Sequence, residues 1–265
     1  MLVTLVDTYK IFLASALFLV LIVLGGGTLW VKHTGFYYCL ALSVDGDASN
    51  AFKCGNYYFG TYGPFGYDIR KAEYYFGRAV EIDPTTPDAW HQYARTAFLR
   101  RDFPTAMYRI NRQFEERGDE LMASYYIRGL IYGYAKKYPM AEQDFKKFLI
   151  WRPTSWAANN DLAWIYFAQG KFTEAKEQSE IGLENYRENV WLLTTHAMAI
   201  YNLGDTDGAY DQLLVARQKA SQLTQKDWLI AYPGNDPAIA KKGLEELKKT
   251  IDKNIELVHS KISSQ

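Results

Sequence analysis

The sequence predicts an all-α protein in which paired helices stack into a solenoid behind one N-terminal transmembrane helix. Three observations predict this fold class. Residues 11–31 form an uncharged stretch of 21 positions, and alanines recur at near-constant intervals from residue 72 to residue 209. Apolar side chains also recur every three or four residues near the C-terminus, as on one face of a helix. We therefore expect an anchor, a solenoid and a terminal helix that covers the last repeat.

Composition excludes several classes of protein. The chain has 265 residues, of which 48% are hydrophobic and 23% charged, so most of it is globular rather than disordered. Its 30 basic and 30 acidic residues cancel, which argues against a non-specific nucleic-acid binder. Two cysteines are too few for a fold held by disulfides. Aromatic residues are unusually dense at 16%.

The N-terminal stretch from Ile11 to Val31 carries no charged residue. As a helix it spans roughly 31 Å, the thickness of a bilayer core. Lys10 and Lys32 flank it, and Trp30 lies where a membrane interface is expected. The alternatives are a cleaved signal peptide, whose apolar core is shorter, and a buried helix of a soluble protein. A retained single-pass anchor over residues 1–33 is the favoured interpretation.

Cys39 and Cys54 follow this stretch closely, and the chain has no other cysteine. They could form a disulfide if the domain faces an oxidising compartment, or they could be two unrelated thiols. Flanking basic residues differ by barely one charge between the two sides, so they decide the orientation only weakly. We expect the N-terminus inside and the soluble domain extracytoplasmic.

The repeat is defined by alanines at intervals of 34, 35, 34 and 34 residues: Ala72, Ala106, Ala141, Ala175 and Ala209. In four of the five cases a large apolar or aromatic residue stands three positions earlier: Ile69, Phe103, Tyr138 and Phe172. A small residue at the start of each second helix lets the two helices of a repeat approach closely.

These residues resemble the tetratricopeptide repeat (TPR), a helix-turn-helix unit of 34 residues. The best unit, residues 122–154, has its motif residues in frame: Gly129, Tyr132, Ala141, Phe145 and Pro153. The resemblance covers about residues 53 to 221, with four good repeats and one weak first repeat. We expect a Gly/Tyr-rich connector and degenerate first helix over residues 34–66, and the solenoid over residues 67–222.

Residues 223–265 depart from the repeat and are expected to form capping helices and a short tail. Thr224 and Asp227 make a capping-box pattern, and residues 233–235 form a turn. The last helix then presents one apolar stripe: Leu244, Leu247, Ile251, Ile255, Val258 and Ile262. We expect this stripe to cover the last repeat, with a coiled-coil contact to another chain as the alternative.

No pattern in the sequence indicates catalysis. The four histidines stand at no metal-binding spacing, and phosphate-loop, nucleophile-elbow and zinc motifs are missing from the sequence. We therefore expect no enzyme activity, no cofactor and no metal. The resemblance implies instead that first helices line a concave groove for a peptide. The groove residues expected on this basis are Arg95, Tyr126, Tyr134, Asn160, Trp164, Trp191 and Tyr201.

The predicted function is that of a membrane-tethered scaffold for protein-protein interaction, which binds a peptide or helix of a partner in a membrane complex. The alternative is a structural subunit of an envelope, pilus or secretion complex that associates through the solenoid ends. A regulatory domain of a separately encoded membrane enzyme is a third class. Residues 87–153 carry 12 basic and 8 acidic side chains, and residues 154–221 carry 5 and 9. This segregation would favour a dipolar partner or head-to-tail self-association.

Overall fold

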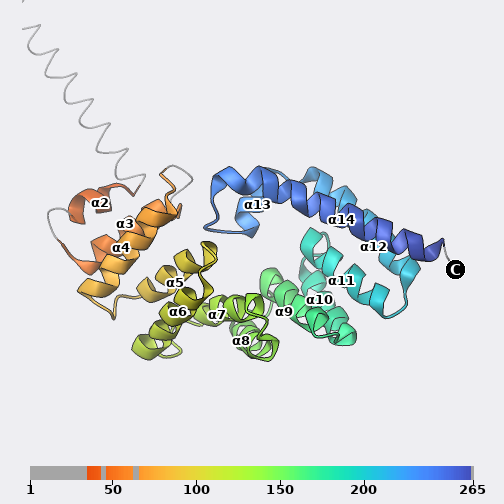
Figure 1. Cartoon of the computed structure of the whole chain (residues 1–265), viewed down its shortest axis with the longest axis horizontal. Coiled ribbons are helices and arrows are strands. Elements are labelled where there is room, and N and C mark those ends of the chain that lie inside the picture. Colours follow the sequence, from red (N-terminus) through yellow and green to blue (C-terminus); the bar gives the residue numbers. More distant parts are fainter. Residues whose placement is uncertain (1–34, 43–45, 62–65, 264–265) are drawn as a thin grey trace, which may run out of the picture. The chain divides into compact units, whose positions relative to one another are not determined.

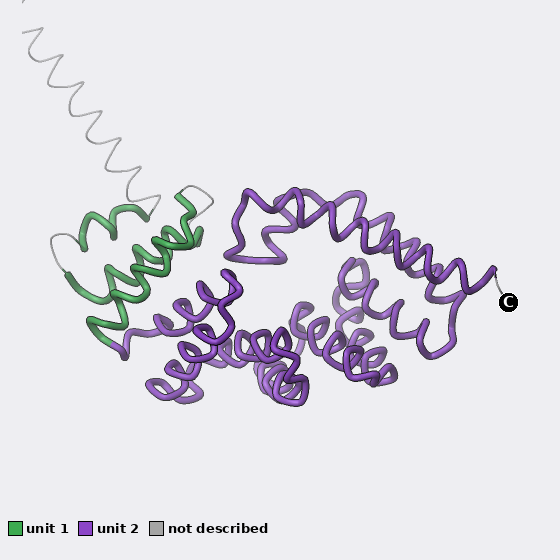
Figure 2. Tube along the Cα trace, viewed as in Figure 1, with its two compact units in different colours: residues 1–83 green, residues 84–265 purple. Residues whose placement is uncertain are grey.

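The computed structural model describes residues 35–42, 46–61 and 66–263. These residues form thirteen α-helices and one short 3₁₀ helix, with no strand in the described part. They divide into two compact units, with the boundary after Asp83 (Figure 2). The predicted boundary between connector and solenoid, at residues 66 and 67, therefore lies inside the first unit.

The first unit contains the helices α2 (Tyr37–Leu42), α3 (Ala48–Tyr58) and α4 (Ile69–Ile82). A disulfide joins Cys39 of α2 to Cys54 of α3, with 4.8 Å between their Cα atoms. Phe76 of α4 is fully buried and packs directly on Gly55 of α3, where a Cβ atom would lie 2.6 Å from its ring. The helices α3 and α4 form the weak first repeat expected from the sequence. Its first helix, α3, is regular, because Gly60 and Gly66 lie beyond its end.

The second unit contains four consecutive helix pairs (Figure 1). They are α5 (Ala89–Leu99) with α6 (Phe103–Arg117), α7 (Ala123–Tyr134) with α8 (Tyr138–Trp151), α9 (Trp156–Ala168) with α10 (Phe172–Asn185), and α11 (Val190–Asn202) with α12 (Thr206–Gln222). The four repeat alanines of this unit start the second helices and are completely buried. The ring of Phe145 packs directly on Gly129 in the same way, because a Cβ atom at position 129 would lie only 3.0 Å from that ring.

The turn inside each pair places one residue in the left-handed region of backbone conformation. Its φ is 63° at Arg101, 59° at Lys136, 74° at Gly170 and 98° at Gly204. Glycine adopts this conformation without the steric conflict that a Cβ atom causes. The α9–α10 and α11–α12 pairs therefore have glycine at this turn position. The α5–α6 and α7–α8 pairs have a basic residue there, which adopts the conformation at a steric cost.

The C-terminal segment consists of α13 (Gln225–Ala231), the 3₁₀ helix η1 (Pro237–Ile239) and α14 (Ala240–Ile262). The predicted capping box is present, with Thr224 and Asp227 bonding each other's backbone N–H groups. The apolar stripe of α14 is divided between two clusters. Its C-terminal half packs with α11 and α12 through Ile251, Ile255 and Val258, and its N-terminal half packs on Trp228 of α13 through Leu244.

The expected anchor from Ile11 to Val31 lies outside the described residues. Among the residues that are described, no helix combines the length and the hydrophobicity needed to cross a membrane.

Candidate binding surface on the first helices of the repeats

In Figure 1 the second helices α6, α8 and α10 lie on the side of the second unit away from α13, and the first helices lie toward α13. Side chains from four consecutive first helices interact there with one another or with the C-terminal segment. We call this set the inner wall: Arg95 of α5, Tyr126 of α7, Asn160 and Asp161 of α9, and Trp191 of α11. Four of its five members are predicted groove residues, contributed by four different repeats.

A chain of hydrogen bonds crosses the middle of the inner wall. The Tyr126 hydroxyl donates to Asp161 Oδ2 at 2.6 Å, and Asn160 Nδ2 lies 3.4 Å from Asp161 Oδ1. Asn160 Oδ1 accepts from Thr195 of α11 at 2.9 Å. Burial raises the pKa of Asp161 to about 6, although the hydrogen bonds from Tyr126 and Asn160 lower it. Burial, followed by the nearby carboxylate, also raises the pKa of Tyr126 well above its usual value.

Arg95 supplies the positive charge of the inner wall. Its Nη1 donates to Gln92 Oε1 at 2.9 Å, and its Nη2 donates to the main-chain carbonyl of Pro233 at 2.9 Å. Burial lowers the pKa of Arg95 to about 10, so the guanidinium stays protonated near neutral pH. A half-buried cation in this position favours hydrogen-bond acceptors, above all anionic ones.

Trp191 supplies the aromatic end of the inner wall. Its ring packs on Trp156 at 5.3 Å between centroids and on Tyr232 at 5.9 Å. Its Nε1 donates to the Tyr232 hydroxyl oxygen at 2.7 Å. Tyr232 and Pro233 both belong to the turn of residues 232–235 between α13 and η1, which we call the cap turn. The cap turn therefore contacts α5 and α11 at once.

Three predicted groove residues make their ring contacts outside the inner wall, although Tyr134 lies close enough to Tyr232 to add to the effect of burial in raising the pKa of Tyr232. Tyr134 is 57% exposed and packs on Phe98 and Phe103, both at 5.5 Å between ring centroids. Trp164 is 46% exposed and meets Tyr138 edge-on. Tyr201 packs against the apolar cluster shared by α11, α12 and α14. Packing against neighbouring helices decides the surroundings of these three side chains.

Two important residues of this surface escaped the sequence-based list. Asp161 occupies a concave position by the repeat register, but nothing local distinguishes it from a solvated carboxylate. Tyr232 lies outside the repeats altogether, and only the course of α13 brings it to Trp191. His91, also at a concave position, is buried, bonds Ser124 Oγ at 3.1 Å and has its pKa lowered to about 3 by burial. It is therefore a neutral structural residue.

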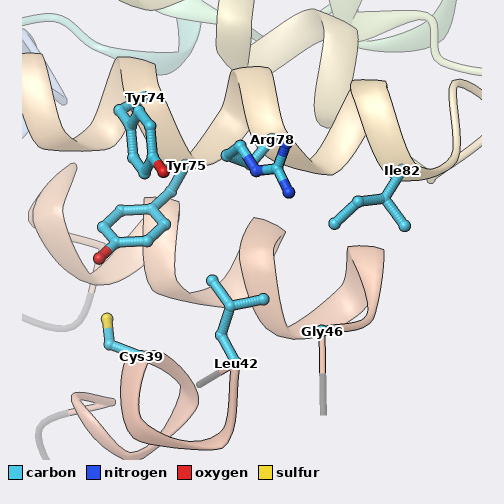
Figure 3. Close-up of a pocket in the computed structure, with 7 residues that line it drawn as sticks. All are labelled: Cys39, Leu42, Gly46, Tyr74, Tyr75, Arg78 and Ile82. Atoms are coloured by element: carbon cyan, nitrogen blue, oxygen red, sulfur yellow. The ribbon is translucent and has the colours of Figure 1, made fainter. Parts of the chain in front are cut away.

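The first unit contains a small cavity of about 300 Å³ (Figure 3). Its lining combines the Cys39 sulfur, aliphatic side chains and the polar groups of Tyr75 and Arg78. Arg78 already donates to Glu81 at 2.8 Å. The cavity is at the lower limit of small-molecule sites, and its lining groups do not form a convergent set of donors and acceptors. Within the described residues no group of His, Cys, Asp or Glu side chains is placed to hold a metal ion.

Comparison with known proteins identifies the fold. No family model matches the sequence, and no curated protein matches it. Among solved structures, YrrB, a TPR protein with an unusual peptide-binding site, matches 74% of this chain and 95% of its own, with 14% identity and a TM-score of 0.57. PilF of Pseudomonas aeruginosa matches 76% of this chain and 91% of its own, with 16% identity and a TM-score of 0.60.

A larger assembly gives a further match. A chain of the APC/C hetero-tetramer Cut9–Hcn1 aligns with 86% of this chain over 43% of its own length, with 14% identity and a TM-score of 0.59. At these identities the likeness concerns the fold alone. The described part of the chain is thus an all-helical solenoid of the TPR type, as the repeat register predicts.

Proposed function

We propose that the protein is a membrane-tethered scaffold whose inner wall captures a segment of a partner protein. The observation that carries this proposal is the convergence of a guanidinium, a phenol, the carboxylate bonded to it and an indole from four successive repeats. Stacked repeats commonly offer such extended surfaces for recognition. Aromatic and arginine side chains are also the residue types that dominate binding energy at protein interfaces.

Tethering is part of the proposal and rests on the uncharged stretch from Ile11 to Val31. The Cys39–Cys54 disulfide supports an oxidising compartment for the domain, because disulfides rarely persist in a reducing cytosol. A membrane-impermeant thiol reagent tests this orientation. We expect labelling from the extracytoplasmic side only, and only after reduction; labelling from the cytoplasmic side without reduction contradicts it.

Assembly through the solenoid ends is the weaker alternative for this chain. The apolar stripe of α14 is already packed on α11, α12 and α13, so the end of the solenoid presents a charged helix rather than an open apolar face. The same packing takes up the residues that a coiled coil would need. The opposite charges of the two halves of the solenoid are the remaining argument for head-to-tail association.

Photo-crosslinking from native membranes tests the scaffold. A photoreactive residue is placed at position 134, where Tyr134 of α7 is 57% exposed and close to Tyr232 of the cap turn, or, as the control, at position 108, where Tyr108 of α6 is 62% exposed. We expect partner proteins to crosslink from position 134 and not from position 108, and Trp191→Ala to abolish the product from position 134. Equal products from both positions, or products that survive Trp191→Ala in a folded chain, would refute it.

A further inference from the structure

We propose that the cap turn is a built-in occupant of the inner wall, and that a partner binds by displacing it with a segment of the same chemistry. That segment carries a phenolic side chain followed by proline and offers the proline carbonyl as an acceptor. The inference rests on the proposed function, because it names the ligand of the same surface and how access to it is controlled.

The chemistry of the ligand follows from the two hydrogen bonds that hold the cap turn. Arg95 Nη2 donates to the carbonyl of Pro233 at 2.9 Å, and Trp191 Nε1 donates to the hydroxyl oxygen of Tyr232 at 2.7 Å. In both bonds the inner wall is the donor and the cap turn the acceptor. The donors come from α5 and α11, which are separated by two whole repeats, whereas the acceptors come from adjacent residues. The inner wall therefore recognises two acceptors at a fixed spacing.

The cap turn is attached to the cap rather than to the repeats. Trp228 of α13 is buried with Ala240 and Leu244 of α14, and its ring lies where a Cβ atom of Gly243 would come within 2.4 Å. This cluster and the one in which the second half of α14 packs on the repeats meet at Leu223 and Leu247, but they share no buried residue. Displacing the cap turn from the inner wall therefore leaves the buried residues of the last repeat in place.

The cap turn is only partly buried, since Tyr232 is 38% exposed. Two hydrogen bonds and the ring contact of Tyr232 with Trp191 hold it on the inner wall, so a segment that makes an additional interaction can compete for the same place. Arg95 meets a neutral carbonyl there, and a guanidinium binds a carboxylate more strongly than a neutral acceptor. A partner segment that adds an acidic group near its proline therefore gains over the cap turn at the same position.

Peptide binding to the full chain, purified in mild detergent, tests the proposal. The probe is a synthetic peptide with the sequence of residues 228–237, blocked at both ends, and its affinity is measured for the wild type and for Tyr232→Ala. Removing the Tyr232 side chain takes away the contact with Trp191 and weakens the closed state without changing the inner wall, so the apparent Kd should fall by about tenfold or more. Tyr232→Phe, which retains the ring and loses the acceptor, should fall between the two.

Two controls complete the experiment. The peptide with alanine in place of its tyrosine should not bind, and Trp191→Phe in the Tyr232→Ala background should remove the gain. The proposal is overturned if Tyr232→Ala binds the peptide no more tightly than the wild type, or if neither chain binds it. It is also overturned if the wild type doubles in mass with concentration and Tyr232→Ala does not. The cap turn would then bind the inner wall of a second copy of the chain instead of its own. Crosslinking of partner proteins from position 134 would survive each of these failures, which separates them from failure of the scaffold itself.

Discussion

The carboxyl group of Asp161 makes the stability of the second unit depend on pH, and Asp161→Asn should remove that dependence. Burial raises the pKa of this carboxyl from 3.8 to about 6 in the folded chain. The folded state therefore binds the proton more tightly than the unfolded state. The stabilisation is complete below the unfolded pKa and is lost as the pH rises through the folded pKa. A shift of that size corresponds to a change of ~3 kcal/mol in the free energy of unfolding between low and high pH. This value is an upper bound, because the side chain is only half-buried.

Urea unfolding followed by circular dichroism, at several values between about pH 4 and pH 8, measures this effect. The asparagine side chain can still accept the hydrogen bond from Tyr126 and has no charge to desolvate. The variant should therefore gain stability relative to the wild type as the pH rises, and the gain should level off above the folded pKa. Tyr126→Phe is the matched comparison, since it removes a hydrogen bond that lowers the pKa of Asp161 and should extend the loss of stability to higher pH. A difference between Asp161→Asn and the wild type that does not vary with pH would refute the reasoning.

Three further predictions concern stability. Lys136→Gly should stabilise the second unit by about 0.5 kcal/mol because the φ of Lys136 is positive, and Gly170→Ala should destabilise it by about 1 kcal/mol. A destabilised Lys136→Gly or a stabilised Gly170→Ala in thermal melts would contradict the argument. Asp144→Ala should lower the free energy of unfolding in urea by about 3 to 5 kcal/mol, because Arg128 loses its buried bidentate partner at 2.7 and 2.8 Å. The double variant Arg128→Met, Asp144→Leu should recover most of that loss. Cys54→Ala should cost about 3 kcal/mol in the first unit, and a reducing agent should abolish the difference from the wild type.

The repeat register is what made most of the fold predictable. The repeat alanines are buried because a fixed interval of sequence returns the chain to the same packing position, and that periodicity is visible without a structure. The capping box of Thr224 was predictable for a similar reason, since it depends on residues three positions apart. The first helix of the weak repeat was not, because clustered glycines suggested a broken helix and in fact lie beyond its end.

The residues of the candidate site also differ in how far the repeat register predicts their position. Arg95, Tyr126, Asn160 and Trp191 were predictable because a solenoid presents equivalent positions of successive first helices on one side. Tyr134, Trp164 and Tyr201 satisfy the same register, but packing against neighbouring rings or against α12 and α14 determines where they lie. Register places a residue on a side of the solenoid and does not identify its contacts.

By itself, the sequence determined the helical class, the length of the repeat, the positions of the small buried residues and the apolar stripe of the last helix. All of these follow from local periodicity. Only the tertiary structure decided that the cap turn, some 138 residues from Arg95 and 41 from Trp191, lies against the inner wall. The physical reason is that this contact depends on how far four stacked repeats rotate and on where α14 directs α13. Small packing angles add up over the stack, and no short stretch of sequence encodes their sum.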